Sequence, residues 1–266
     1  MIFVILGVLG LAFGSFVTAL TWRLHEGKDF VAGRSECEHC GHVLSVFDLV
    51  PIISWLLLGG RCRYCHTKIS WQNPVIEVTM TVLFVGSYIF WPSPLFSLEA
   101  WISFGLWLVY LILLVALVVY DLRWMLLPDK LVFVLIALGF VDVGLRLSVA
   151  NNLTIISYVQ QIILGALVFG GFYGFLYVIS KGRWVGLGDV KLGLFIGTVL
   201  GWQQGFVALL LANIIGLVVV APGLAARRLS MRSRIPFGPF LIAAFIITGL
   251  FGSSILSWYF SLILLQ

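Results

Sequence analysis

Long apolar runs separated by short polar segments constrain this chain more than any other feature of its sequence. Crossing a bilayer as a helix takes about 20 apolar residues, so these runs predict about eight transmembrane helices. Charged residues make up only 10% of the chain, against about 25% in soluble domains. The fold class we expect is therefore an all-α polytopic membrane protein. The runs cover residues 2–22, 75–92, 100–120, 131–147, 155–179, 190–201, 205–222 and 237–262, and the sixth is short.

The distribution of basic residues indicates how these helices are oriented. Of the 16 Lys and Arg residues, only Arg146 lies outside the four segments 23–74, 121–130, 180–191 and 223–236. Because Lys and Arg concentrate in the cytoplasmic loops of membrane proteins, we expect these segments in the cytoplasm and the N-terminus outside. The net charge of +5 is then a topology signal, so we expect a lipid bilayer around the protein and no nucleic-acid partner.

We expect three segments along the chain. The first run has no basic residue ahead of it and no clear cleavage site, so residues 1–22 are interpreted as a retained first transmembrane helix. Residues 23–74 form the only sizeable polar segment and are interpreted as a cytoplasmic loop domain. Residues 75–266 are interpreted as a membrane domain of about seven helices.

The loop domain contains all four cysteines, as Cys37-Glu-His-Cys40 and Cys62-Arg-Tyr-Cys65. Each Cys-x-x-Cys turn presents two thiolates, and two such turns can close a tetrahedral four-thiolate zinc site. Disulfides are rare in the cytoplasm, so structural zinc is favoured over redox-active or unbound thiols. A segment of this size has little apolar mass, so a metal would contribute folding energy.

Two aspartates lie where apolar runs meet the expected cytoplasmic rim. Asp121 closes the third run, and Asp189 stands in the stretch Gly186-Leu-Gly-Asp-Val-Lys191. The simpler interpretation is that both are loop acids, with Asp189 serving as a helix N-cap. However, an ionisable group is costly to place in apolar surroundings and is therefore a candidate for function.

These two carboxylates, brought together, predict a specific chemistry. Two neighbouring carboxylates do not both ionise easily, so the pair shares a proton. The ionised member takes a proton from water while the protonated member donates to a peptide carbonyl, as in aspartic proteases. Gly186 and Gly188 leave room for an extended substrate backbone beside Asp189. Asp129 is the rival partner for Asp121.

Further residues accompany this pair in a specific order and spacing. They are Gly14-Ser15-Phe16, Arg23-Leu24, the two cysteine pairs, Asp48, Pro51, Ser54-Trp55, Pro74, Glu77, Asp121, Pro128-Asp129, Gly186 to Leu192, and Pro236-Phe-Gly-Pro239. With them, nearly the whole chain resembles the type IV prepilin peptidases, a family of GxGD-type membrane aspartic proteases. Position 18 is Thr where the family usually has Asn, and position 25 is His where Pro is usual.

The resemblance implies that Asp121 and Asp189 are the catalytic pair. It implies substrates that are prepilins or pseudopilins, whose short basic leader is cut after a glycine at the cytoplasmic face. Many members of the family also methylate the new N-terminus with S-adenosylmethionine, through the N-terminal part that includes the cysteine loop.

The inner-loop acids nearest the membrane rim are candidates for contact with a basic leader. These acids are Glu77 and Asp129, and Lys191 joins the glycines 186 and 188 as a candidate substrate contact. A proton-coupled transporter would explain the aspartates but not the cysteines, and a zinc-dependent scaffold would explain the cysteines alone. Oligomeric state is not determined by the sequence.

Overall fold

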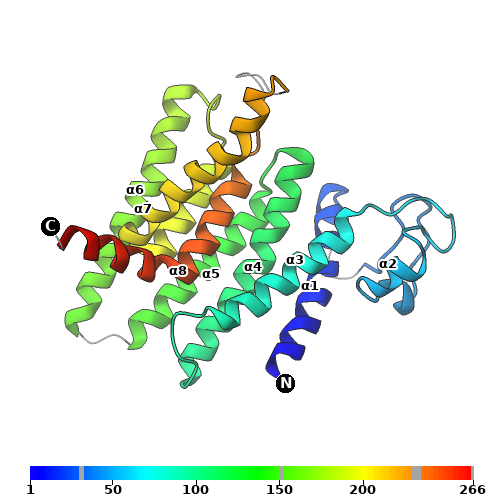
Figure 1. The fold of residues 1–266 in the computed structure, drawn as a ribbon, viewed down its shortest axis with the longest axis horizontal. Coiled ribbons are helices and arrows are strands. Elements are labelled where there is room, and N and C mark those ends of the chain that lie inside the picture. Colours follow the sequence, from blue (N-terminus) through cyan, green and yellow to red (C-terminus); the bar gives the residue numbers. More distant parts are fainter. Residues whose placement is uncertain (30–32, 150–151, 229–234, 265–266) are drawn as a thin grey trace. The chain divides into compact units, whose positions relative to one another are not determined.

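The computed structural model describes residues 1–29, 33–149, 152–228 and 235–264. Arg232 and Arg234, two of the expected cytoplasmic basic residues, lie outside these ranges. Within them the protein is helical, with two isolated antiparallel bridges and no strand, so the all-α class is confirmed. The elements are α1 (Ile2–His25), the 3-10 turn η1 (Val46–Leu49), α2 (Ile53–Leu57), α3 (Gln72–Ile89), α4 (Leu98–Trp124), α5 (Asp129–Val149), α6 (Asn152–Ser180), α7 (Leu187–Ala225) and α8 (Gly238–Leu264) (Figure 1).

Six of the described helices are long and apolar enough to cross a membrane, namely α1, α4, α5, α6, α7 and α8. The sequence places a further span at 75–92, which corresponds to α3. This helix has 18 residues and begins with polar Gln72, Asn73 and Glu77, so it is shorter in apolar length than the others. The spans expected at 190–201 and 205–222 both fall within α7.

The chain forms two compact units, which are described separately. The first comprises residues 1–90 and 108–119, and the second comprises residues 91–107 and 120–266. In the first unit, α1 packs closely on α3 through two glycines. A Cβ atom at Gly10 would lie 2.5 Å from the Cα of Thr81, and one at Gly14 would lie 2.5 Å from the Cα of Glu77. Glycines one turn apart therefore allow the two backbones to approach, as small residues do in membrane helix pairs.

In the second unit, α7 consists of two arms that meet at Gly201. This glycine has φ 71° and ψ 179°, which is not helical, and positive φ is readily accessible only to glycine. Contacts with α6 show that the chain reverses there. Added Cβ atoms at Gly193, Gly197, Gly201 and Gly205 would meet, in turn, Tyr173, Gly165, Gln161 and Phe169. The contact thus moves down α6 and then back up it.

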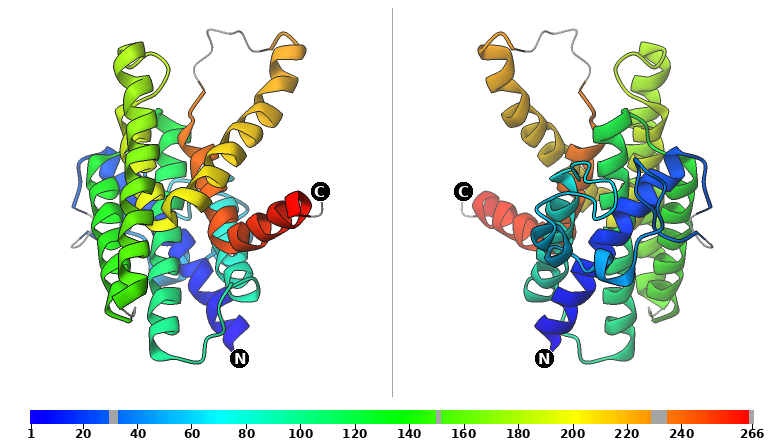
Figure 2. Two further views of the ribbon diagram at one scale, coloured as in Figure 1. Left: turned by 90° about the vertical axis from the view of Figure 1, so that its left-hand side faces the viewer. Right: turned by 90° about the vertical axis from the view of Figure 1, so that its right-hand side faces the viewer.

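The second arm of α7, residues 202–225, runs alongside α8. Gly252 lies against Gln204, near the start of this arm, and Gly216 lies against Phe240, near the start of α8. The arm therefore returns toward the N-terminal end of α8, obliquely to α6 (Figure 2). The first arm, residues 187–200, is only about 21 Å long at 1.5 Å per residue, in agreement with the short sixth run of the sequence.

Candidate active site and metal centre

Asp121 is positioned by the end of α4. The helix stops at Trp124 because Met125 adopts a left-handed conformation with φ 54°, and its N–H donates to the Asp121 carbonyl at 2.8 Å. The Asp121 side chain is buried. Its carboxylate accepts a hydrogen bond from the backbone N–H of Gly238, at the start of α8.

Asp189 occupies the first turn of α7. Gly186 is the N-cap residue of this helix, and its N–H donates to the Asp189 Oδ2 at 3.0 Å. Asp189 is therefore a capping residue at the third helical position and not the N-cap that the simpler interpretation predicted. Glycine has no side chain to return the bond, so only this half of a capping box forms. The side chain is buried, with 9% of the residue exposed.

Asp121 and Asp189 lie near enough to interact electrostatically. The C-terminal end of α4 therefore meets the N-terminal ends of α7 and α8 within the second unit. Two buried carboxylates in this arrangement, each held by one backbone N–H, can share a proton and act on a bound water as acid and base.

Leu127 fills the space between these helix ends. A Cβ atom at Gly188 would lie 2.8 Å from the Leu127 Cβ, and one at Gly238 would lie 3.6 Å from the Leu127 Cδ2. The room that the sequence predicts beside Gly188 is thus occupied by a side chain from the segment between α4 and α5. A substrate backbone at Gly188 would have to displace it.

Asp129 and Lys191 form an ion pair beside the aspartates. The Lys191 Nζ lies 2.6 Å from the Asp129 Oδ1, and it also stands over the Phe133 ring at 5.0 Å from the centroid. The pair joins the start of α5 to the second turn of α7. Asp129, the rival partner for Asp121, is thus paired with a lysine, whereas the electrostatic partner of Asp121 is Asp189.

Glu77 belongs to the first unit and is held in place by that unit. It is 6% exposed, and its Oε2 accepts a hydrogen bond from the Ile52 N–H at 2.7 Å. Ser15 of α1 also hydrogen-bonds to it. Ile52, at φ 59°, is the residue that precedes α2. The carboxylate therefore fastens the stretch between the two cysteine pairs to α1 and α3.

The four cysteines form one cluster in the first unit. The sulfur atoms of Cys37, Cys40, Cys62 and Cys65 all lie within 4.8 Å of one another, and those of Cys37 and Cys65 are 3.8 Å apart. A tetrahedral zinc with bonds of about 2.3 Å separates its sulfur ligands by about 3.8 Å. The donor set and its spacing thus fit a four-thiolate zinc site.

The two cysteine turns share the same backbone design. The Cys37 N–H donates to the His42 carbonyl, and the Cys62 N–H donates to the Thr67 carbonyl, both at 2.9 Å. Hydrogen bonds from Thr67 lower the pKa of the Cys65 thiol to about 6, whereas burial raises the pKa of the Cys62 thiol. A lowered pKa supplies the thiolate form that binds metal.

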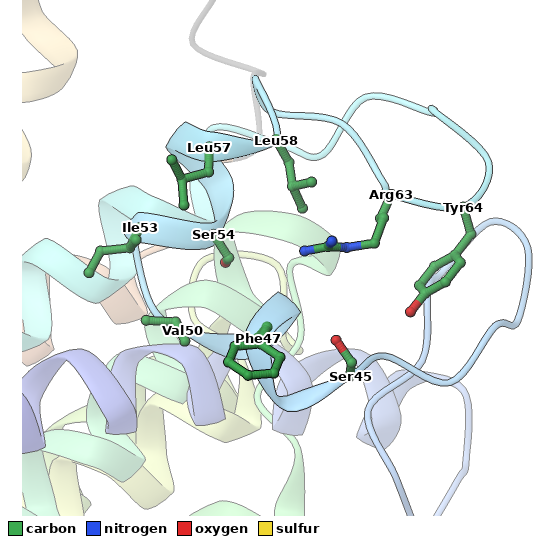
Figure 3. A pocket seen from close by; sticks show the side chains of 9 residues that line it. All are labelled: Ser45, Phe47, Val50, Ile53, Ser54, Leu57, Leu58, Arg63 and Tyr64. Atoms are coloured by element: carbon green, nitrogen blue, oxygen red, sulfur yellow. The ribbon is translucent and has the colours of Figure 1, made fainter.

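A cavity of about 470 Å³ is lined in part by Arg63 and Tyr64, the two residues between Cys62 and Cys65 in the sequence (Figure 3). It is lined by Ser45, Phe47, Val50, Ile53, Ser54, Leu57, Leu58, Arg63 and Tyr64. The Arg63 Nε lies 2.6 Å from the Asp48 Oδ1. Burial opposes ionisation of Asp48, but hydrogen bonds from Ser45 and Arg63 outweigh it and hold the pKa of this carboxyl below its usual range. The cavity wall therefore carries a fixed cation beside apolar and aromatic side chains.

Comparison with known proteins shows where the chain belongs. Residues 8–91 match the bacterial peptidase A24 N-terminal domain, and residues 108–221 match the type IV leader peptidase family. A prepilin leader peptidase/N-methyltransferase of Bacillus subtilis (strain 168) is 30% identical over 260 residues, which cover 98% of each chain. The chain belongs to the type IV leader peptidase family. This membership confirms the enzyme class expected from the sequence, a prepilin peptidase.

Two further relatives of this chain carry the same description. One from Aeromonas hydrophila is 33% identical over 230 residues, covering 85% of this chain and 74% of the relative. One from Stutzerimonas stutzeri is 30% identical over 277 residues, covering 95% and 91%. No solved structure matches the chain.

Sequence reasoning missed three residues that lie around the two aspartates. Gly238 binds Asp121, Leu127 covers Gly188, and Tyr173 interacts electrostatically with Asp189. Only Gly238 had a local signal, because the Pro236-Phe-Gly-Pro239 stretch marks non-helical backbone at the start of a helix. Leu127 and Tyr173 stand in apolar stretches of the sequence, where nothing distinguishes them from residues that only pack.

Proposed function

We propose that this chain removes the short basic leader of type IV prepilins or pseudopilins, cutting after a glycine at the cytoplasmic face, with Asp121 and Asp189 as its catalytic pair. The observation that carries the proposal is the electrostatic contact of these two buried aspartates where α4, α7 and α8 meet. The family indicates the reaction type, which is peptide hydrolysis, and two carboxylates can carry it out without a further group.

The pair performs peptide hydrolysis by moving protons. The ionised carboxylate takes a proton from water as the water oxygen bonds to the carbonyl carbon of the substrate. The protonated carboxyl donates its proton to the carbonyl oxygen, which gives a neutral tetrahedral diol. The carboxyl that took the proton from water then gives it to the amide nitrogen. The carbon–nitrogen bond breaks as a diol hydroxyl returns its proton to the other carboxylate, and an acid and an amine leave. The Gly238 and Gly186 N–H groups hold the two carboxylates in place.

The substrate backbone lies along Gly186 and Gly188 in this proposal, with Leu127 displaced from Gly188. The leader then passes Asp129 and Lys191, whose ion pair borders the site. Asp129 attracts a basic leader, whereas Lys191 holds Asp129 toward α7. Glu77 stays the second proposed leader contact, and its carboxylate is buried and accepts a hydrogen bond from the Ile52 N–H.

The orientation follows from the charges. With the N-terminus outside, the polar segments that adjoin Asp121, Asp189 and Gly238 contain most of the basic residues, which favours a cytoplasmic site. The reversal of α7 at Gly201 supports the even number of crossings that this orientation needs. We propose that residues 1–22, 23–74 and 75–266 have separate functions. The second segment binds zinc, and the third carries out proteolysis.

The test of the catalytic pair uses purified protein in detergent and a prepilin-like peptide. Asp121→Asn and Asp189→Asn each abolish cleavage, while the protein still inserts and folds. Asp142→Asn is the matched control, because Asp142 is a buried acid of the same unit whose Oδ2 binds Arg146 at 2.7 Å, and an amide keeps an acceptor there. Retained cleavage in either test variant rules out the pair. Proton-coupled uptake into liposomes without proteolysis would instead identify a transporter.

We also propose that the chain binds structural zinc at its four cysteines and methylates the new N-terminus with S-adenosylmethionine. Bound S-adenosylmethionine supplies an electrophilic methyl group. The cavity of Figure 3 has the volume of a small-molecule site. In this proposal Arg63 pairs with the carboxylate of S-adenosylmethionine, and Tyr64 and Phe47 contact its adenine ring.

Methyl transfer and binding are tested separately. The mass of the new N-terminus increases by one methyl group only when S-adenosylmethionine is present. Arg63→Gln weakens binding of S-adenosylmethionine in calorimetry, whereas Arg61→Gln, at a residue that does not line the cavity, leaves it unchanged. An unmethylated product with wild-type protein contradicts the methylation proposal and leaves the peptidase proposal intact.

A further inference from the structure

Tyr173 of α6 is a buried hydroxyl group that the reaction described above does not use. It is 3% exposed, and among the residues that the structure describes its hydroxyl has no hydrogen-bond partner. Burying a hydroxyl without a partner costs free energy. Such a group in a native protein calls for a reason, and a role in function is one of the recognised reasons.

The Tyr173 ring contacts both sides of the aspartate site. A Cβ atom at Gly193 would lie 2.7 Å from the Tyr173 Cδ2, and Gly193 lies one turn after Asp189 on the same face of α7. On the other side, the ring centroid is 6.2 Å from that of Phe237, which directly precedes Gly238. Tyr173 therefore packs between the turn that carries Asp189 and the segment that binds Asp121.

The phenol group also lies near a carboxylate. It interacts electrostatically with Asp189, whose Oδ2 is held by the Gly186 N–H. One hydrogen bond leaves a carboxylate free to rotate about its Cβ–Cγ bond, whereas a donor to the other oxygen fixes its plane. Hydrogen bonds of this kind are often long in substrate-free enzymes and shorten when the substrate is bound.

We propose that Tyr173 is a positioning residue of the peptidase, whose hydroxyl donates a hydrogen bond to the Asp189 carboxylate in the substrate-bound site and fixes its orientation toward the attacking water. The inference rests on the proposed catalytic pair. It accounts for a hydroxyl with no hydrogen-bond partner among the described residues, because the bond to Asp189 forms only when a substrate is bound.

The experiment compares Tyr173→Phe with wild-type protein in detergent, on a prepilin-like peptide. Loss of a hydrogen bond to a charged group lowers kcat by roughly 10- to 100-fold, and KM stays within about twofold, because the hydroxyl does not touch the substrate. The thermal midpoint does not fall, since phenylalanine removes a hydroxyl that bonds to none of the residues that the structure describes. Tyr158→Phe is the matched control, at an exposed tyrosine of the same helix, and leaves all three quantities unchanged.

Two results overturn this inference. One is a kcat of Tyr173→Phe at the wild-type level. The other is a lower kcat with a lower thermal midpoint, which shows that the hydroxyl has a structural partner. Asp189→Asn separates the two levels of the proposal. If Asp189→Asn still cleaves the peptide, the proposed catalytic pair is wrong. If Asp189→Asn is inactive but Tyr173→Phe is fully active, only the proposed role of Tyr173 is wrong.

Discussion

The Gly238 N–H donates a hydrogen bond to the Asp121 carboxylate, and no side chain fits at position 238 without displacing that carboxylate. The start of α8 thereby fixes an acid at the end of α4, although the two residues are far apart in the sequence. This contact explains why a glycine between two prolines opens the last helix.

Gly238→Ala is expected to lower kcat by about 100-fold or more, because a displacement of about 1 Å in a catalytic group has an effect of that size. The added Cβ would lie 2.6 Å from the Asp121 Oδ2. Gly171→Ala is the control, at a helical glycine of the same unit where a Cβ meets nothing within 4 Å. Peptide cleavage assays measure both, and full activity of Gly238→Ala would show that the carboxylate does not need this position.

Gly188→Ala is expected to reduce cleavage at least tenfold, because the proposed path of the substrate backbone runs along Gly188. Its Cβ would also clash with Leu127, whose Cβ and Cδ1 both lie 2.8 Å away, and the double variant Gly188→Ala/Leu127→Gly relieves that clash because glycine lacks both atoms. We expect the double variant to fold as well as wild type, by thermal midpoint, and to remain impaired in cleavage. Complete rescue of activity would mean that Gly188 serves only to pack against Leu127.

Asp129→Lys is expected to discriminate between leaders. The kcat/KM for a basic leader falls several-fold more than that for the same peptide with its leader charges neutralised, and the difference shrinks in about 1 M salt. Glu99→Lys is the control, because Glu99 lies in the first turn of α4, at the opposite end from Asp121. Equal losses for both leaders would contradict an electrostatic role for Asp129.

Glu77→Ala is expected to destabilise the first unit by about 1–3 kcal/mol, since it leaves the Ile52 N–H without its acceptor. Glu77→Gln keeps a carbonyl oxygen at that place and has a smaller effect. Limited proteolysis of the segment between η1 and α2, together with the thermal midpoint, measures both. Identical behaviour of the two variants would argue against the bond to Ile52 as the reason for this residue.

Zinc content tests the cysteine cluster. Wild-type protein is expected to carry one zinc per chain, and Cys37→Ser and Cys62→Ser to lose it, because each removes one of four ligands. His39→Ala keeps the metal, since His39 is not part of the cluster of sulfur atoms. Metal analysis by mass spectrometry decides the point, and an unchanged zinc content in the serine variants would refute the site.

The sequence by itself determined the features that depend on local composition and spacing. Apolar length predicts membrane helices because a bilayer tolerates no unsatisfied backbone, and two Cys-x-x-Cys turns predict a four-sulfur cluster because each turn is locally closed. The same logic singled out Asp121 and Asp189, since acids beside apolar runs are costly.

Only the tertiary structure decided which distant groups meet. It paired Asp129 with Lys191, bonded Glu77 to Ile52, and placed Gly238, Leu127 and Tyr173 around the two aspartates. The contacts around the two aspartates depend on how helices of the second unit pack, and the Glu77 contact depends on how the segment before α2 lies against α3. A side chain's partner across a helix interface is set by the close approach of two backbones, which residue order along either helix does not encode.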